Sequence, residues 1–357
     1  MNDFCRKYGL SIPVVLAPMG GEPSTPELAA AVSNAGGLGS LAAAYSNPER
    51  IERDIARIRE LTRRPFAVNL FSPQAQLPLN GIASAVVDFL RPFHERLGLK
   101  APELPQKPIE NFDDQLDAVC KAAPSIVSFT FGLLPAQATQ RLKAQGTYLI
   151  GTATTVEEAK VLEQSGVDAV IAQGSEAGAH RGTFAVPAEE ALVGTVALAP
   201  QVVDAVRIPV LASGGIMDGR GIVAALALGA SAVQMGTAFL ACTEAGTSAV
   251  YRKALAAARE DQTTLTRAFS GRMARGLRNE FIARWNASAL THLPYPWQNA
   301  LTQPMRRAAS AAKQSDLLSL WAGQGVPMLR ELSAEQLMSK LNDEIQQAWT
   351  NLKNQLS

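Results

Sequence analysis

Short apolar runs alternate with amphipathic helical patterns along roughly the first 240 residues of the chain. Because strands that alternate with helices lie parallel in one sheet, this alternation predicts an α/β fold. Eight such units close a (β/α)8 barrel, the TIM barrel. The predicted strands are residues 12–19, 38–42, 66–70, 126–129, 148–150, 169–172, 210–212 and 232–235.

The chain is longer than a barrel requires, since it has 357 residues and a single barrel commonly has ~250. We therefore expect a second, smaller, mainly helical domain. Prolines interrupt the alternation at about 71–124, which predicts an excursion over the barrel mouth. Ser333 and Gln336 predict a capping box at the start of a last amphipathic helix. The predicted segments are a barrel at 1–241, a helical domain at 242–317 and C-terminal helices that pack back on the barrel at 318–357.

Composition argues for a small-molecule partner. The 33 basic and 32 acidic residues nearly cancel, so no overall field favours nucleic acid or an anionic membrane. Cys5, Cys120 and Cys242 are widely spaced, which argues against disulfides and against a thiolate metal site. Carboxylates are rare at the predicted strand ends, so we expect no metal. No apolar run is long enough to span a bilayer, and we expect a cytoplasmic protein.

The segment 173–182 follows the sixth predicted strand and combines three glycines with an amide, a carboxylate, an imidazole and a guanidinium. Ligands of parallel barrels bind at the carboxyl ends of the strands. We therefore interpret His180 as a functional residue rather than a solvent-facing loop histidine. Glu176 is expected to accept hydrogen bonds that fix the loop, and Arg181 is expected to be a surface charge or to pair with the backbone.

Two further glycine-rich segments, 213–219 and 234–237, follow the seventh and eighth strands. Many barrels bind a phosphate there through backbone N–H groups, although such glycines can also merely turn the chain. Asn69 lies at the end of the third strand and offers its amide either to a ligand or to its own backbone. Met19 and the segment 295–299 are candidates to line an apolar slot for a flat ring, or else belong to the core.

Taken together, these segments resemble the class I nitronate monooxygenases, formerly called 2-nitropropane dioxygenases, over nearly the whole chain. One departure from the family pattern is Ala179, where relatives usually have glycine, and we expect a local change of backbone shape there. The resemblance is carried by Ala17-Pro-Met19, residues 34–39, Asn69, residues 173–182, Ser213-Gly-Gly-Ile216, residues 234–237, residues 295–299 and residues 321–325.

The resemblance implies FMN at the barrel mouth and a helical domain that covers the substrate. It implies oxidation of alkyl nitronates, such as propionate 3-nitronate, by dioxygen to a carbonyl compound and nitrite. The electron would pass singly through a flavin semiquinone, with the nitronate held by a hydrogen bond from His180, and the enzyme would be a monomer or homodimer. The implied FMN contacts are Met19, Asn69, Gln173, Gly178, Gly214, Gly215, Gln234, Met235, Gly236 and Thr237. The implied substrate contacts are Tyr295, Gln298 and Asn299.

Two alternatives remain open from the sequence. Flavin-dependent NADH:quinone and enoyl-acyl-carrier-protein reductases share the glycine-rich loops and a histidine after the sixth strand, whereas Arg181 and the segment 295–299 favour the monooxygenase. A barrel that binds a phosphorylated metabolite without flavin is the other alternative. The fold alone does not separate these activities.

Overall fold

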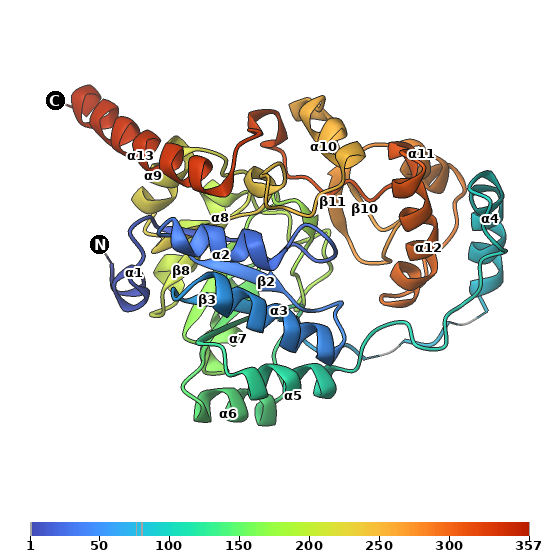
Figure 1. The fold of residues 1–357 in the computed structure, drawn as a ribbon, viewed down its shortest axis with the longest axis horizontal. Helices are drawn as coiled ribbons and strands as arrows, with labels where there is room; N and C mark the ends of the chain where they lie inside the picture. Colours follow the sequence, from blue (N-terminus) through green and yellow to red (C-terminus); the bar gives the residue numbers. More distant parts are fainter. Residues whose placement is uncertain (1, 76, 80, 357) are drawn as a thin grey trace.

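The centre of the computed structural model, which describes residues 2–75, 77–79 and 81–356, is a barrel of eight parallel strands (Figure 1). Their hydrogen-bonded order is β1-β9-β8-β6-β5-β4-β3-β2, and a bridge between Val15 and Leu38 closes the circle. The predicted (β/α)8 barrel is confirmed, because every predicted strand overlaps an observed one. The strands are β1 (Val14–Leu16), β2 (Gly39–Ala42), β3 (Phe66–Phe71), β4 (Ile126–Thr130), β5 (Tyr148–Ala153), β6 (Ala169–Gln173), β8 (Val210–Ser213) and β9 (Ala232–Met235).

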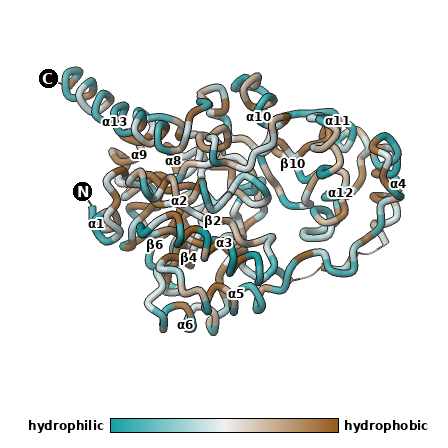
Figure 2. Tube along the Cα trace, in the orientation of Figure 1, coloured by the Kyte–Doolittle hydropathy of each residue, from teal (hydrophilic) through white to brown (hydrophobic). Residues whose placement is uncertain are grey.

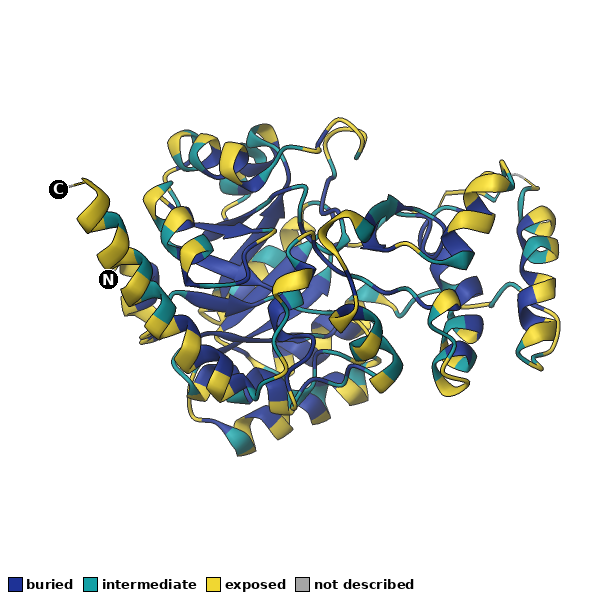
Figure 3. Ribbon diagram, turned by 90° about the horizontal axis from the view of Figure 1, so that it is seen from above, coloured by how far each residue is buried: buried dark blue, intermediate teal, exposed yellow. Residues whose placement is uncertain are grey.

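Helices surround the barrel with their buried faces toward the strands and their exposed faces outward (Figure 3). α1 (Asp3–Tyr8) instead closes the end at which the strands begin, because Phe4 and Tyr8 pack against the first residues of the strands. The carboxyl ends of the strands lie at the opposite mouth. The surrounding helices are α2 (Pro26–Asn34), α3 (Pro48–Leu61), α5 (Phe112–Ala122), α6 (Ala136–Ala144), α7 (Val156–Gln164), α8 (Thr195–Ala205) and α9 (Gly219–Ala227).

A second lobe lies beside the barrel mouth (Figure 1). The excursion reaches the far side of this lobe, where Val86, Leu90 and Phe93 of α4 share a core with Leu301 and Met305 of α12. The second lobe thus includes α4, which lies within the segment 1–241 that was predicted as barrel. The predicted domain boundaries at residues 242 and 318 remain predictions. Its helices are α4 (Ala83–Arg96), α10 (Ala249–Ala256), α11 (Glu280–Ala287) and α12 (Trp297–Ala311). The short 3-10 helices are η1 (Thr237–Phe239), η2 (Glu260–Gln262), η3 (Ser315–Leu317) and η4 (Val326–Met328).

A small antiparallel sheet joins the lobe to the barrel. It consists of β10 (Thr263–Thr266), β11 (Ala274–Leu277) and the two-residue strand β7 (Ala179–His180). The sequence analysis missed these strands, because they are short and lie in a region without strand periodicity. The sheet matters for the site, since β11 pairs Ala274 with His180 and Arg275 with Ala179.

The last helix, α13 (Ala334–Leu356), begins at the predicted capping box. The N–H of Ser333 donates to the Gln336 amide oxygen at 3.0 Å, and the N–H of Gln336 donates to the Ser333 hydroxyl at 3.1 Å. Leu337 and Leu341 pack on the barrel, whereas the mainly hydrophilic end of the helix projects beyond it (Figure 2). Among the described residues, no helix combines the length and apolar character needed to cross a membrane.

Candidate active site

A cavity of about 420 Å³ lies at the carboxyl ends of the barrel strands and is also lined by residues of the second lobe. Every barrel strand contributes a lining residue from its last positions or from the loop after it. α12 closes the other side with Asn299, Gln303, Arg306 and Arg307. This volume is within the ~300–1,000 Å³ typical of small-molecule sites.

The cavity gathers most of the residues that the sequence nominated. Asn299 also lines it, whereas Tyr295 and Gln298 do not. The roles assigned to these residues stay predictions, but their convergence from distant segments is a property of the fold. The nominated residues that line the cavity are Met19, Asn69, Gln173, Gly178, His180, Gly214, Gly215, Gln234, Met235, Gly236, Thr237 and Asn299.

Gln298 lies in the core of the second lobe. Its amide nitrogen donates to the carbonyl of Ala268 at 2.7 Å, and its amide oxygen accepts the N–H of Leu293 at 3.0 Å. Both ends of the amide are therefore used by the protein. The position of Gln298 supports a structural role rather than the implied contact with substrate.

Tyr295 is buried behind the wall of the cavity, with its ring 6.3 Å from that of His180. Its hydroxyl and that of Tyr45, which does line the cavity, have no hydrogen-bond partner of good geometry among the described residues. Burial raises the pKa of both phenols, so both keep their proton. Tyr45 was missed by the sequence analysis, because it belongs to no motif and reaches the site only through the loop after β2.

His180 sits in an aromatic surround, with ring centroids 5.8 Å from Phe131 and 5.6 Å from Trp321. Its Nε2 lies 2.8 Å from the hydroxyl oxygen of Ser270. Burial, followed by the nearby guanidinium groups of Arg272 and Arg306, lowers the pKa of His180 to about 3. The imidazole is therefore neutral at physiological pH.

The loop that carries His180 is fixed by buried charge. Arg181 is 1% exposed and donates to three backbone carbonyls, those of Gly174, Gln173 and Ala191. Of the two alternatives predicted for Arg181, backbone pairing is thus correct. Glu176 accepts the N–H and the hydroxyl of Thr195, each at 2.9 Å, which confirms its predicted role in fixing the loop.

Gln173 and Ala179 shape the part of this loop that faces the cavity. The amide of Gln173 donates to the carbonyl of His180 at 3.1 Å and accepts the N–H of Gly182 at 2.8 Å. Ala179 has a φ of 61°, in the left-handed region that glycine adopts readily. The backbone there keeps a glycine-like conformation although the residue is alanine.

Four backbone N–H groups at the ends of β8 and β9 form a cradle for an anion. Those of Gly214, Gly215, Gly236 and Thr237 donate to no acceptor among the described residues, and all four residues line the cavity. Gly214 and Gly215 have φ of 120° and 71°, and a Cβ on Gly214 would lie 2.8 Å from the Thr195 hydroxyl. The cradle therefore requires glycine, and its donors suit a phosphate.

The cavity is positively charged, although the whole chain is nearly neutral. Arg50, Arg306 and Arg307 line it together with a single acid, Glu22. Arg306 donates to the backbone carbonyl and the side-chain oxygen of Asn299, both at 2.8 Å, and its Nε has no partner among the described residues. Burial lowers the pKa of Arg306 to about 10, so it remains a cation. The sequence analysis missed these arginines, which reach the site only through the packing of α12 and α3.

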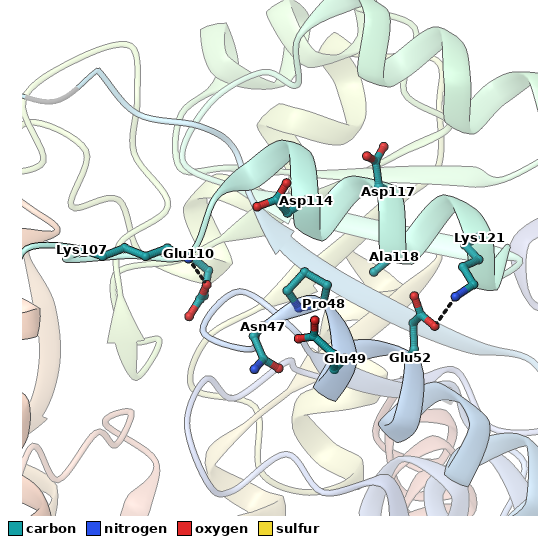
Figure 4. A pocket seen from close by; sticks show the side chains of 10 residues that line it. All are labelled: Asn47, Pro48, Glu49, Glu52, Lys107, Glu110, Asp114, Asp117, Ala118 and Lys121. Carbon is teal, nitrogen blue, oxygen red and sulfur yellow. Dashed lines mark hydrogen bonds and ion pairs between the residues drawn. The ribbon is translucent and has the colours of Figure 1, made fainter.

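A second hollow lies between α3 and α5 on the outside of the barrel (Figure 4). It is bordered by acidic side chains and by two lysines, which pair as Lys107 with Glu110 at 2.7 Å and Lys121 with Glu52 at 2.6 Å. In the described part of the chain, no three His, Cys, Asp or Glu residues are arranged to hold a metal ion. The cavity at the barrel mouth is therefore the candidate active site.

The fold and this cavity define a (β/α)8 barrel enzyme with its ligand site at the carboxyl ends of the strands. A family model described as nitronate monooxygenase matches residues 4–344. A protein of Bacillus subtilis (strain 168) named probable nitronate monooxygenase is 43% identical over 349 residues, covering 96% of this chain and 99% of that protein. The chain belongs to the nitronate monooxygenase family and is an oxidoreductase, so the predicted resemblance is confirmed.

Two solved structures are similar over nearly their whole length. Nitroalkane oxidase from Streptomyces ansochromogenes is 42% identical with a TM-score of 0.90, covering 96% of this chain and 98% of that one. FabK from Thermotoga maritima is 29% identical with a TM-score of 0.78, covering 99% of both chains. The barrel and the second lobe are thus shared with both proteins.

Proposed function

We propose that this chain oxidises alkyl nitronates, such as propionate 3-nitronate, with dioxygen to a carbonyl compound and nitrite, using FMN. Membership of the nitronate monooxygenase family and the likeness to a nitroalkane oxidase support this proposal. The observation that carries it is the cavity itself, in which a backbone anion cradle and a neutral imidazole share a positively charged space.

The residues at the mouth fit FMN. The free N–H groups of Gly214, Gly215, Gly236 and Thr237 would hold its phosphate, and Met19 lies beside this cradle, with its sulfur 4.0 Å from the position of a Cβ on Gly236. The other predicted FMN contacts, from Asn69 to Met235, line the same space. Bound there, FMN supplies the single-electron acceptor that nitronate oxidation requires.

The protein's own contribution is binding, charge and exclusion of water. Arg306 and Arg307 give the cavity a positive potential that favours an anionic nitronate. Phe71, Phe131 and Trp321 contribute an apolar wall around His180, which strengthens electrostatic interactions by keeping water out. His180 lies where it can contact the substrate as a neutral imidazole.

Turnover of the purified, FMN-saturated protein tests this proposal. With propionate 3-nitronate in air, we expect nitrite to form and dioxygen to be consumed without any NADH. His180→Asn should retain FMN and lower kcat/KM for a neutral nitroalkane by about 10²-fold or more, since the imidazole is the group that would accept the α-proton. Glu49→Gln, in the outer hollow, is the matched control and should behave as the wild type. Absence of nitrite, together with NADH-dependent reduction, would instead favour the reductase alternative.

We also propose that the protein acts in the cytoplasm, as a monomer or homodimer, with the nitronate and dioxygen as its small-molecule partners. Three buried free cysteines support a reducing compartment. Sedimentation of the holoenzyme would distinguish the two assembly states.

A further inference from the structure

Ser270 lies directly behind the catalytic histidine, in a turn that leads into β11. The side chain is 1% exposed, and its hydroxyl oxygen has three hydrogen-bonding neighbours. Nε2 of His180 lies at 2.8 Å, the carbonyl oxygen of Arg272 at 3.0 Å and the backbone nitrogen of Arg272 at 3.3 Å. The nitrogen of Arg272 is a donor, so the hydroxyl accepts one hydrogen bond from it.

The hydroxyl has only one hydrogen, and two acceptors compete for it. The carbonyl of Arg272 receives no other hydrogen bond among the described residues. If Ser270 donated to His180, this carbonyl would lose its hydrogen-bond partner, which is unfavourable in a partly buried turn. If Ser270 donates to the carbonyl, every group is satisfied, provided that Nε2 of His180 carries a hydrogen and donates it to Ser270.

The turn that holds Ser270 is fixed from α12. The hydroxyl of Thr302 donates to the carbonyl of Phe269 at 2.6 Å, and Gln298 donates to that of Ala268 at 2.7 Å. At Gly271, with φ of 78°, a Cβ would lie 2.1 Å from the carbonyl oxygen of Leu293. Because the turn has no room to shift, the position of Ser270 relative to His180 is set by the fold.

We propose that Ser270 is a positioning residue that fixes His180 as the tautomer with hydrogen on Nε2, so that His180 offers the lone pair of Nδ1 to the substrate. The expected kinetic effect rests on the proposed function, whereas the assignment of the tautomer does not. Nδ1 makes no hydrogen bond among the described residues, and the guanidinium groups of Arg272 and Arg306 disfavour a second proton on the ring.

The inference changes the role of His180 in binding. The resemblance implied that His180 donates a hydrogen bond to the anionic nitronate, which an unprotonated Nδ1 cannot do. Donors to the nitronate then come from other residues that line the cavity, among them Arg306 and Arg307. A neutral nitroalkane, unlike the nitronate, must first lose its α-proton. Its α-C–H bond breaks, the bonding pair forms the C=N bond of the nitronate while the N=O π pair moves onto oxygen, and the proton passes to an acceptor such as Nδ1.

Nitrogen-15 spectra of the FMN-saturated protein, labelled at histidine, test the tautomer directly. The chain has only His94, His180 and His292, so the His180 signals are assigned by their loss in His180→Asn. We expect the wild type to carry hydrogen on Nε2 and not on Nδ1. We expect Ser270→Ala to give a mixture of tautomers. Hydrogen on Nδ1 in the wild type would overturn the proposal, even if Ser270→Ala did not fold.

Thr302→Val is the matched control, because it removes a hydrogen bond to the same turn without touching His180. It should leave the tautomer unchanged. If Ser270→Ala also left the tautomer unchanged, or if Thr302→Val altered it as strongly, Ser270 would not be the residue that fixes it.

Kinetics then separate this inference from the proposed function. Ser270→Ala should lower kcat/KM for a neutral nitroalkane by about tenfold to a hundredfold, with a smaller loss for the preformed nitronate. Equal losses for both would contradict the assigned role of Nδ1. Failure of the wild type to oxidise any nitronate would refute the proposed function and leave the tautomer result standing.

Discussion

Ala179, the residue before His180, holds a left-handed backbone that costs an L-residue about 1–2 kcal/mol relative to glycine. Ala179→Gly should therefore raise the free energy of unfolding by about 0.5–1 kcal/mol, after subtracting the greater chain entropy of glycine in the unfolded state. Urea unfolding measures the change. Ala283→Gly, at an exposed helical position in α11, is the matched control and should lower stability by about 1 kcal/mol. A loss of stability in Ala179→Gly would show that φ at this residue is not strained.

The lowered pKa of His180 predicts a dependence of stability on pH. Between about pH 3 and 6.5 the unfolded chain binds a proton at this residue and the folded protein does not. His180 therefore reduces stability as pH falls through this window and has no such effect above it. We expect the unfolding free energy of the wild type to fall more steeply than that of His180→Asn between pH 7 and 4. Parallel curves would mean that His180 titrates normally in the folded protein.

Gln298 illustrates what sequence reasoning at the level of residues could not decide. Neighbouring positions on a helix point in different directions, so the motif alone does not show which of Gln298 and Asn299 faces the cavity. The motif nominated both, and only the orientation of α12 shows that Asn299 lines the cavity. Gln298→Ala should lower the free energy of unfolding by about 2–4 kcal/mol, because it leaves two buried backbone groups without a partner. Thermal unfolding checks this, and an unchanged melting temperature would contradict it.

At the scale of elements, Glu158 joins the start of α7 to the segment that follows β7. It is fully buried and accepts hydrogen bonds from Thr154 and from the N–H groups of Phe184 and Ala185. Glu158→Gln turns an acceptor into a donor that faces these donors, so stability should fall by about 2–4 kcal/mol. Glu157→Gln, one residue earlier and exposed, should change stability by less than about 1 kcal/mol. Equal effects in urea unfolding would refute the role of Glu158.

The barrel strands and the capping box of α13 could be predicted because local sequence specifies them. Buried parallel strands are continuous apolar runs, and a capping box needs only two residues three positions apart. The sheet β10-β11-β7 could not be predicted in the same way, since β7 is two residues long and is defined by its partner. The excursion was recognised from its prolines, but its packing against α12 is a tertiary contact that no local pattern encodes.

At the scale of the whole molecule, the candidate active site is lined by two lobes whose contributions are distant in sequence. The anion cradle follows two barrel strands and was predictable from their glycines, whereas Arg306 and Arg307 come from α12. A balanced composition of 33 basic and 32 acidic residues gave no sign of the positive cavity. The positive potential of the cavity arises because folding places arginines from distant segments around it.

Anaerobic mixing of the FMN-saturated protein with a short alkyl nitronate, and separately with NADH, tests the central claim most directly. The flavin absorption is recorded in both experiments. We predict that the nitronate changes the spectrum of the oxidised flavin within the mixing time and that NADH leaves it unchanged. Full reduction by NADH, with no response to the nitronate, would contradict the proposed function and point to a reductase on the same barrel.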